Sequence, residues 1–236
     1  MTFKMKKIIS LFALAAFVLV GFSSCDYDGK DDAYVTHYVS IDLKEGDTYL
    51  VPVGSQYVEP GYTATEGTED VTSKVVVSGE VDATKMGIYT LTYSAANKDG
   101  FSAPVTRKVL VYDPEITTDI SGTYKVKNTD GSQSLFDRYP VIGNSVTLTQ
   151  LAPGLYSISD YWAGLYDVTV GYGAAYRCSG YFSLGKDNSI KGISSSDPWN
   201  NPMESVTGSY NPETGKVTFD VTISYHLVMV LEKKIK

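Results

Sequence analysis

The sequence is poor in the residues that most enzymes use for catalysis. Its 236 residues include two histidines, His37 and His226, and two cysteines, Cys25 and Cys178. A histidine metal site or a catalytic triad would require His37 and His226 to meet from distant parts of the chain. No Gly-x-Ser-x-Gly nucleophile motif is present. The run 171–176 ends in tyrosine, with no expected helix after it, unlike a dinucleotide-binding fingerprint. We therefore expect no enzymatic activity, no metal and no cofactor.

Positive charge is scarce as well. The formal net charge is −7, and it becomes −10 once the three lysines of the N-terminal segment described below are removed. An acidic surface repels phosphate backbones and anionic lipid headgroups. The charge excludes nucleic acid as a partner, and it excludes attachment to a membrane by charge alone.

Amphipathic helical periodicity is absent beyond the first 24 residues. The chain instead contains 19 tyrosines and 21 glycines, and it is rich in threonine and valine. These residues favour pleated, half-buried strands joined by tight turns. We predict an all-β protein: an Ig-like β-sandwich followed by a second antiparallel domain, either a meander or a barrel.

The N-terminus has the pattern of an export signal. Lys4, Lys6 and Lys7 precede an apolar run, Ile8–Val20, which is shorter than the roughly 20 residues that a membrane-spanning helix needs. Small residues then lead to Cys25. This order resembles the lipobox of bacterial lipoproteins, although phenylalanine, Phe22, stands where leucine is usual. The resemblance implies a signal peptide at 1–24 and lipidation of Cys25, with palmitate among the acyl chains; an ordinary signal peptide is the alternative.

Residues 25–37 read as an acidic, solvated tether. An acidic cluster directly after a lipidated cysteine is similar to the signal that sends lipoproteins of Bacteroidota to the outer face of the outer membrane; a plain linker is the alternative. With Cys25 lipidated, Cys178 has no disulfide partner, and we expect it to be a small core residue.

Residues 38–113 form the first predicted domain, with strands at 38–43, 48–53, 71–78, 88–95 and 105–112. Residues 88–95 alternate, so that Tyr89, Leu91 and Tyr93 share one apolar face, which must pack against a second sheet. The segments Gly54–Ala64, Gly87–Ala95 and Arg107–Val111 resemble the bacterial Ig-like domain family first named from a pesticidal crystal protein. That family supplies spacers or adhesive modules and no catalytic residues, and Tyr89 is placed to bond the backbone as a corner tyrosine does.

Residues 116–236 form the second predicted domain, which begins after a break at Pro114. We expect about nine strands in sequential hairpins: 122–127, 145–150, 155–159, 166–172, 176–184, 189–193, 206–210, 216–224 and 225–231. The segments Gly122–Tyr124, Leu155–Asp160 and Gly180–Leu184 resemble the C-terminal domain of two-domain Bacteroidota lipoproteins. Such proteins often accompany polysaccharide-uptake systems, and the function of this domain family is unassigned.

Aromatic residues are dense between 156 and 181, and Trp199 follows in a Pro- and Asn-rich loop. Aromatic rings pack against the flat faces of sugars, whose hydroxyls seek Asp and Asn partners. The predicted ligand-binding residues are Tyr161, Trp162, Asp197, Trp199 and Asn200. The strand tyrosines are read mainly as core or sheet-face residues.

These observations predict a lipid-anchored cell-surface protein of the outer membrane that binds a glycan without transforming it. The main alternative is a structural or assembly subunit that docks on an outer-membrane transporter or another surface lipoprotein. A hydrolase would need paired carboxylates, for which Asp160, Asp167 and Asp197 are the nearby acids, although Asp160 is better placed to end a strand.

Overall fold

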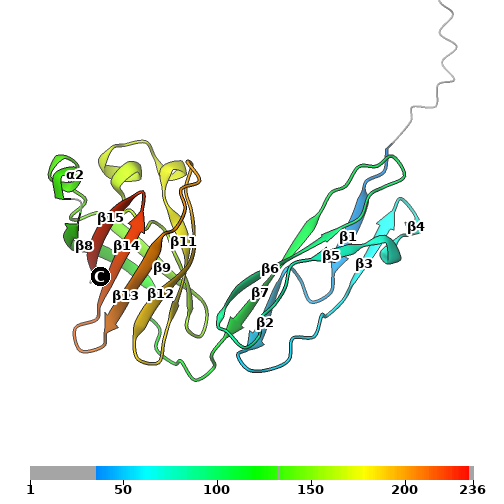
Figure 1. The fold of residues 1–236 in the computed structure, drawn as a ribbon, viewed down its shortest axis with the longest axis horizontal. Coiled ribbons are helices and arrows are strands. Elements are labelled where there is room, and N and C mark those ends of the chain that lie inside the picture. Colours follow the sequence, from blue (N-terminus) through cyan, green and yellow to red (C-terminus); the bar gives the residue numbers. More distant parts are fainter. Residues whose placement is uncertain (1–35, 132, 234–236) are drawn as a thin grey trace, which may run out of the picture. The chain divides into compact units, whose positions relative to one another are not determined.

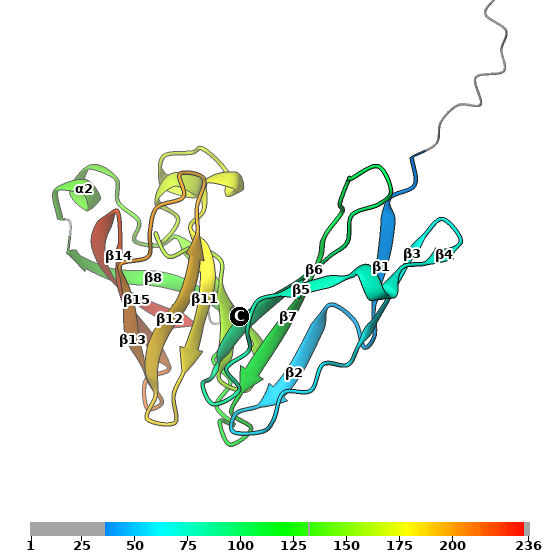
Figure 2. The same ribbon diagram turned by 45° about the vertical axis from the view of Figure 1, so that its right-hand side comes forward.

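The computed structural model describes residues 36–131 and 133–233, and the signal segment, Cys25 and most of the tether lie outside this range. Within it, fifteen strands form two separate groups (Figures 1 and 2). Strands β1 to β7 form two small sheets, and β8 to β15 form a closed barrel. The prediction of an all-β fold is confirmed. No helix in the described ranges is both long enough and apolar enough to cross a membrane.

The first group is a sandwich of two sheets. One sheet has the order β1-β3-β4, with β1 at Val39–Leu43, β3 at Tyr62–Glu66 and β4 at Glu69–Asp70. The other has the order β2-β7-β6-β5, with β2 at Thr48–Pro52, β7 at Val105–Tyr112, β6 at Gly87–Ser94 and β5 at Val76–Ser78. Strand β2 runs parallel to β7, whereas the remaining pairs of these sheets are antiparallel. The apolar core of this group draws on both sheets.

Strand β6 follows the alternation read from the sequence. Leu91 and Tyr93 are buried, and the hydroxyl of Tyr89 donates a hydrogen bond to the carbonyl of Lys85 at 3.0 Å, as a corner tyrosine does. The predicted strand at 71–78 is only partly right. Its first half is a 3₁₀ turn, Thr72–Lys74, that brings Val71 fully into the core, and β5 begins afterwards.

One charged residue lies inside the sandwich. Arg107 of β7 is fully buried and forms an ion pair with Glu59, and its guanidinium also donates to the carbonyls of Lys44, Gly46 and Gly61. The hydroxyls of Tyr57 and Tyr93 donate to the same carboxylate. Because each buried donor has a partner, the charge is tolerated in the core.

The second group is a barrel with the cyclic strand order β10-β11-β12-β13-β14-β15-β8-β9. Its strands are β8 Gly122–Gly131, β9 Ser145–Ala152, β10 Leu155–Ile158, β11 Ser179–Leu184, β12 Ser189–Ser196, β13 Ser205–Asn211, β14 Lys216–Ile223 and β15 Tyr225–Lys233. Closure settles the choice between a meander and a barrel. Along β14, Val217, Phe219, Val221 and Ile223 are buried, as the sequence predicted.

Two predictions for this domain were wrong. Residues 166–172 are not a strand: the chain forms a π-helix, Leu165–Thr169, followed by a 3₁₀ turn, η3 Ala174–Tyr176. The next strand, β11, consequently starts at Ser179 rather than at residue 176. A short helix, α2 Gln133–Arg138, was also unexpected; it lies at the same end of the barrel as the π-helix (Figure 1, top). Cys178 is fully buried, as expected of a core residue.

Candidate functional site

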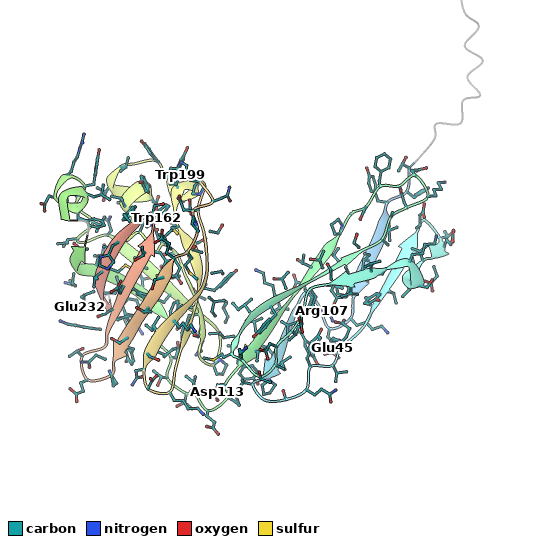
Figure 3. All side chains as sticks on the ribbon, viewed as in Figure 1. Glu45, Arg107, Asp113, Trp162, Trp199 and Glu232 are labelled. Carbon is teal, nitrogen blue, oxygen red and sulfur yellow. The ribbon has the colours of Figure 1, made fainter. Side chains whose placement is uncertain are left out.

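Four aromatic rings of the loops after β10 and β12 pack against one another, at the end of the barrel where Figure 3 labels Trp199. We call this set, Tyr166, Tyr172, Tyr176 and Trp199, the aromatic platform. The centroid of the Tyr166 ring lies 4.8 Å from that of Trp199 and 6.3 Å from that of Tyr172. The centroid of the Tyr176 ring lies 5.7 Å from Trp199 and 5.1 Å from Tyr172. The four contacts close a circuit, so each ring is held by two neighbours.

The platform is exposed at its surface and anchored below. Trp199, Tyr172 and Tyr176 have 47%, 57% and 37% of their area exposed, whereas Trp162 beneath them has 1%. The centroid of Trp162 lies 5.7 Å from Trp199 and 5.2 Å from Tyr166. Its indole N–H donates to the carbonyl of Ile223 at 3.2 Å, which ties the platform to β14.

The loop that carries the tyrosines is held by the buried carboxylate of Asp160. This carboxylate accepts hydrogen bonds from the backbone N–H groups of Trp162 and Gly164 at 2.9 Å and from that of Cys178 at 3.1 Å. Asp160 thus joins the two ends of the loop, as a turn residue at the end of a strand does. Burial raises the pKa of Asp160 to about 6, although the three hydrogen bonds and nearby Arg177 act in the opposite direction.

Two consecutive left-handed residues then turn the chain into the π-helix: Ala163 has φ 57° and Gly164 has φ 76°. The side-chain amide of Asn144 donates to the carbonyls of both residues, at 3.1 and 3.2 Å, and to the hydroxyl of Thr169 at 3.0 Å. Asn144 therefore fixes both ends of the π-helix against the barrel.

The Trp199 loop is organised by a second buried carboxylate. Asp197 accepts hydrogen bonds from the backbone N–H of Trp199 at 2.9 Å, from that of Asn201 at 3.1 Å and from the Asn201 side-chain amide at 2.9 Å. Asn200 takes the left-handed conformation, φ 55°, which asparagine tolerates better than most residues. These contacts hold Trp199 at the surface.

The structure separates the predicted ligand-binding residues into three kinds. Trp199 and Asn200 are exposed and remain candidates for contact. Trp162 and Tyr161, predicted as ligand contacts, are buried, and the Tyr161 hydroxyl donates to the carbonyl of Tyr181 at 2.9 Å, so neither side chain is open to the surface in this structure. Asp197 is only 8% exposed, and both of its carboxylate oxygens are engaged within the loop, so its role is to position Trp199.

Sequence reasoning missed Tyr172 and Tyr176 as exposed members of the site. The local signal was present, because both lie in the aromatic-rich segment and Tyr172 is flanked by Gly171 and Gly173. They were read as strand residues, a class more often found in cores or on sheet faces. A single ion pair lies beside them, between Arg177 Nε and Asp167 Oδ2 at 2.6 Å. Across the described residues, no group of three or more His, Cys, Asp or Glu side chains is arranged to hold a metal ion.

Comparisons with known proteins match both domains. A family model described as a C-terminal domain matches residues 113–233, just over half of the chain, and the model of the bacterial surface protein Ig-like domain matches residues 41–111. The solved lipoprotein BT2262 from Bacteroides thetaiotaomicron is 32% identical over 83% of this chain and 100% of that one, with a TM-score of 0.42. These matches confirm the lipoprotein and Ig-like resemblances.

A second solved structure, of CBM51-2 in complex with GlcNAc and INT domains from Clostridium perfringens ZmpB, is 16% identical over 77% of this chain and 29% of that one. The TM-score of this match is 0.27. No curated protein matches the chain.

Proposed function

The chain belongs to the family of the Bacteroides lipoprotein BT2262, and from this premise we propose that it is a non-enzymatic cell-surface protein that binds glycans. In this proposal it is an accessory protein of a polysaccharide-uptake system. The aromatic platform is the glycan-binding surface, and Trp199, Tyr172 and Tyr176 provide the contacts.

The observation that carries the proposal is the exposure of three rings, Trp199, Tyr172 and Tyr176, that belong to one circuit of packed rings on a rigid base. Pyranose rings present flat C–H faces that pack against aromatic faces, and such contacts are strongest when the protein side is fixed in advance. Trp162, Asp160 and Asp197 provide this fixation from below. A contiguous cluster of aromatic side chains exposed to water typically marks a binding site on a protein surface.

In this proposal, the N-terminal signal and the lipid anchor hold the aromatic platform outside the cell. A signal peptide followed by lipidated Cys25 anchors the protein in the outer membrane, because two or more acyl chains hold a protein stably where one chain does not. The Ig-like domain acts as a spacer between the anchor and the barrel.

The test is binding of the purified protein, with serine at Cys25 to keep it in solution, to a panel of soluble polysaccharides by affinity gel electrophoresis and calorimetry. We expect Trp199→Ala and Tyr172→Ala each to weaken binding by about tenfold or more, as central aromatic contacts do. Phe101→Ala is the matched control, since Phe101 is 53% exposed on the Ig-like domain and lies away from the platform in sequence. If the wild type binds and both platform variants bind equally well, the platform is not the site.

Protein docking is the second candidate function, and the same observation favours it, because tyrosine and tryptophan are enriched at the centres of protein interfaces. The partner would be an outer-membrane transporter or another surface lipoprotein. Failure of the wild type to bind any glycan, together with loss of a co-purifying membrane protein in Trp199→Ala, would favour this alternative.

A further inference from the structure

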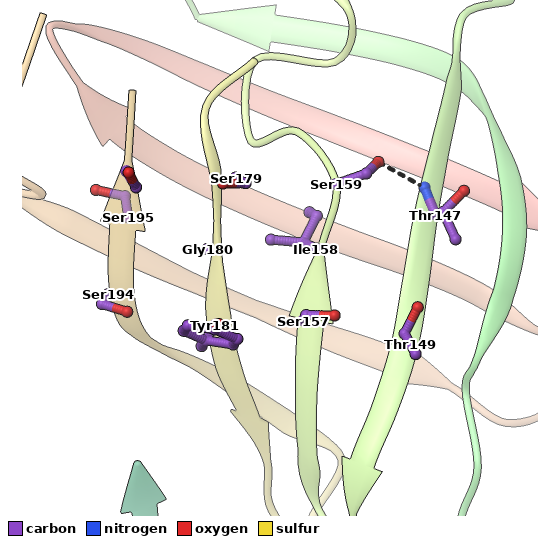
Figure 4. A pocket seen from close by; sticks show the side chains of 11 residues that line it. Thr147, Thr149, Ser157, Ile158, Ser159, Ser179, Gly180, Tyr181, Ser194 and Ser195 are labelled. Atoms are coloured by element: carbon purple, nitrogen blue, oxygen red, sulfur yellow. Dashed lines mark hydrogen bonds between the residues drawn. The ribbon is translucent and has the colours of Figure 1, made fainter. Parts of the chain in front are cut away.

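A hydroxyl-lined groove crosses the outer wall of the barrel (Figure 4). It has a volume of about 410 Å³ and spans four neighbouring strands, β9, β10, β11 and β12. Its lining residues are Thr147, Thr149, Ser157, Ile158, Ser159, Ser179, Gly180, Tyr181, Ser194, Ser195 and Ser196. The groove is hollow because short outward-facing side chains stand where longer ones would fill it.

The hydroxyls form two rows that run across the strands. In one row, Thr149 pairs with Ser157, Ser157 with Tyr181, and Tyr181 with Ser194. The other row lies nearer the platform and contains Thr147, Ser159, Ser179 and Ser196, in which Ser159 Oγ accepts a hydrogen bond from the Thr147 backbone N–H at 2.9 Å. Neighbouring strands are about 4.8 Å apart, so the backbone positions that carry the hydroxyl side chains of a row repeat at about that spacing.

A second hollow adjoins the groove, between the two loops that carry the platform rings. It shares Ser159, Ser179 and Ser196 with the groove and is closed on its other side by Ala174, Ala175, Arg177, Asp197 and Pro198. Pro198 directly precedes Trp199, and Ala175 directly precedes Tyr176, so the second hollow is lined by the sequence neighbours of two platform residues. The groove and the second hollow therefore form one surface that extends from the rows of hydroxyls to the two loops that carry the rings.

The chemistry of this surface selects among ligands. None of the eleven residues that line the groove carries a charge. In the second hollow, Arg177 is paired with Asp167, and Asp197 is engaged in its own loop. A hydroxyl both donates and accepts, so rows of hydroxyls complement a ligand that is itself covered with hydroxyls. An acidic polymer would meet a negatively charged protein.

We infer that the platform and the groove form one track for an uncharged polysaccharide chain, with the groove as a second subsite beyond the aromatic rings. The inference rests on the proposed function and specifies its ligand class. A chain of repeating sugar units would lie across the strands, with one end packed on Trp199 and Tyr176 and its hydroxyls bonded to the rows at Ser159, Ser179 and Ser194.

The experiment first identifies which neutral polysaccharide binds most tightly among soluble starch, yeast mannan and pectic galactan, with polygalacturonate as the acidic comparator. It then compares the binding of a disaccharide and of a longer oligosaccharide prepared from that polysaccharide. One variant removes hydroxyls (Ser157→Ala, Ser179→Ala and Ser194→Ala together), and another fills the groove (Ser179→Tyr). The matched control is Ser205→Ala, Thr207→Ala and Ser209→Ala together, which removes three outward-facing hydroxyls of β13.

We expect the wild type to bind the longer oligosaccharide more tightly than the disaccharide. Both groove variants should bind the longer ligand about tenfold or more weakly and keep the affinity for the disaccharide. In the triple alanine variant the loss is the sum of three hydrogen bonds, each of modest net value. In Ser179→Tyr the larger side chain occupies the space of the ligand. The control should match the wild type, and thermal unfolding should show all variants folded.

The failures of the two proposals are distinguishable. If the wild type binds neutral glycans through Trp199 but the groove variants bind both ligand lengths like the wild type, the groove inference is overturned and the proposed function stands. Tighter binding of polygalacturonate than of any neutral polysaccharide would overturn the ligand class. If the wild type binds none of the glycans, the proposed function fails and the groove inference fails with it.

Discussion

Two tyrosine hydroxyls in the barrel differ in how they are satisfied, and the difference is measurable. The Tyr124 hydroxyl donates to the carbonyl of Ile120 at 2.7 Å. The Tyr225 hydroxyl is buried without a hydrogen-bond partner among the described residues. A buried polar group without a partner costs free energy, whereas one that is bonded contributes about 1 kcal/mol.

Tyr225→Phe should therefore leave the free energy of unfolding unchanged or raise it by up to about 1 kcal/mol, since only an unsatisfied hydroxyl is removed. Tyr124→Phe, the matched control, should lower it by about 1 kcal/mol. Denaturant unfolding of both variants measures the contrast. An equal loss in the two variants would mean that Tyr225 has a partner, such as a bound water.

Asp160 predicts a pH dependence with a defined sign. Its pKa in the fold is about 6, against 3.8 for the free side chain, so between these values the native state binds more protons than the unfolded state. The contribution of Asp160 to stability should fall as the pH rises from about 4 to about 6, by on the order of 3 kcal/mol. Asp160→Asn cannot titrate, so the stability of the wild type relative to this variant should decrease over that range in denaturant unfolding.

Asp187 provides the control of opposite sign. Hydrogen bonds from Ser189 lower the pKa of this exposed carboxylate, so its contribution is present at neutral pH and is lost as the pH falls. The difference between the wild type and Asp187→Asn should thus shrink toward low pH. A pH-independent difference for Asp160→Asn would contradict the raised pKa.

At the scale of the element, the segment between β10 and β11 depends on a left-handed turn before the π-helix. Gly164→Ala places a methyl group at φ 76° and 2.9 Å from the Asn144 side-chain amide. We expect a loss of stability of roughly 1–3 kcal/mol and weaker glycan binding, because Asn144 and the neighbouring Tyr166 must move.

Gly171→Ala distinguishes the cost of backbone strain from the cost of a steric clash with Asn144. Gly171 also has a left-handed conformation, φ 82°, but an added methyl group would meet nothing within 4 Å. It should cost about 1 kcal/mol from backbone strain alone, less than Gly164→Ala. Thermal unfolding compares the two variants, and equal losses would mean that the contact with Asn144 is unimportant.

The same segment explains which elements were predictable from the sequence. Residues 216–224 were predicted well, because their alternation agrees with the turn signal of the preceding Asn-Pro and Gly. Residues 166–172 alternate equally well, with Tyr166, Val168, Val170 and Tyr172 at every second position, yet they do not form a strand. The deciding contacts, Asp160 with three backbone N–H groups and Asn144 with the π-helix, join residues that sequence periodicity cannot connect.

The site was predictable to the same extent. Composition identified the aromatic segment and Trp199, but it could not separate Trp162 from Trp199, since both lie beside turn-forming residues. Burial of Trp162 follows from the fold of the loop over the barrel end. The groove gave no recognisable motif, because its hydroxyls come from four strands and meet only through strand register.

At the scale of the whole molecule, the proposed anchor predicts where the protein is found in the cell. Cys25→Ser should move it from the membrane fraction to the soluble fraction, because the acyl chains would have no attachment point. Cys178→Ala, which changes the only other cysteine, should leave it in the membrane fraction. Fractionation followed by mass spectrometry of the N-terminal peptide measures both.

Persistence of Cys25→Ser in the membrane fraction would contradict lipid anchoring at this residue. Accessibility of the wild type to protease added to intact cells tests the outward orientation. These results bear on the anchor alone, and glycan binding in solution does not depend on them.

Burial of Cys178 has one more consequence. In Cys25→Ser the chain has a single thiol, that of Cys178, which is fully buried in the barrel. Burial raises the pKa of this thiol above its ordinary value. The thiolate is the form that attacks alkylating reagents, so labelling of the buried sulfur requires the barrel to open. The labelling rate thus reports the opening equilibrium without any added probe. A sugar that binds only the closed form should slow labelling in proportion to its occupancy, which makes the buried sulfur a sensor for the ligand.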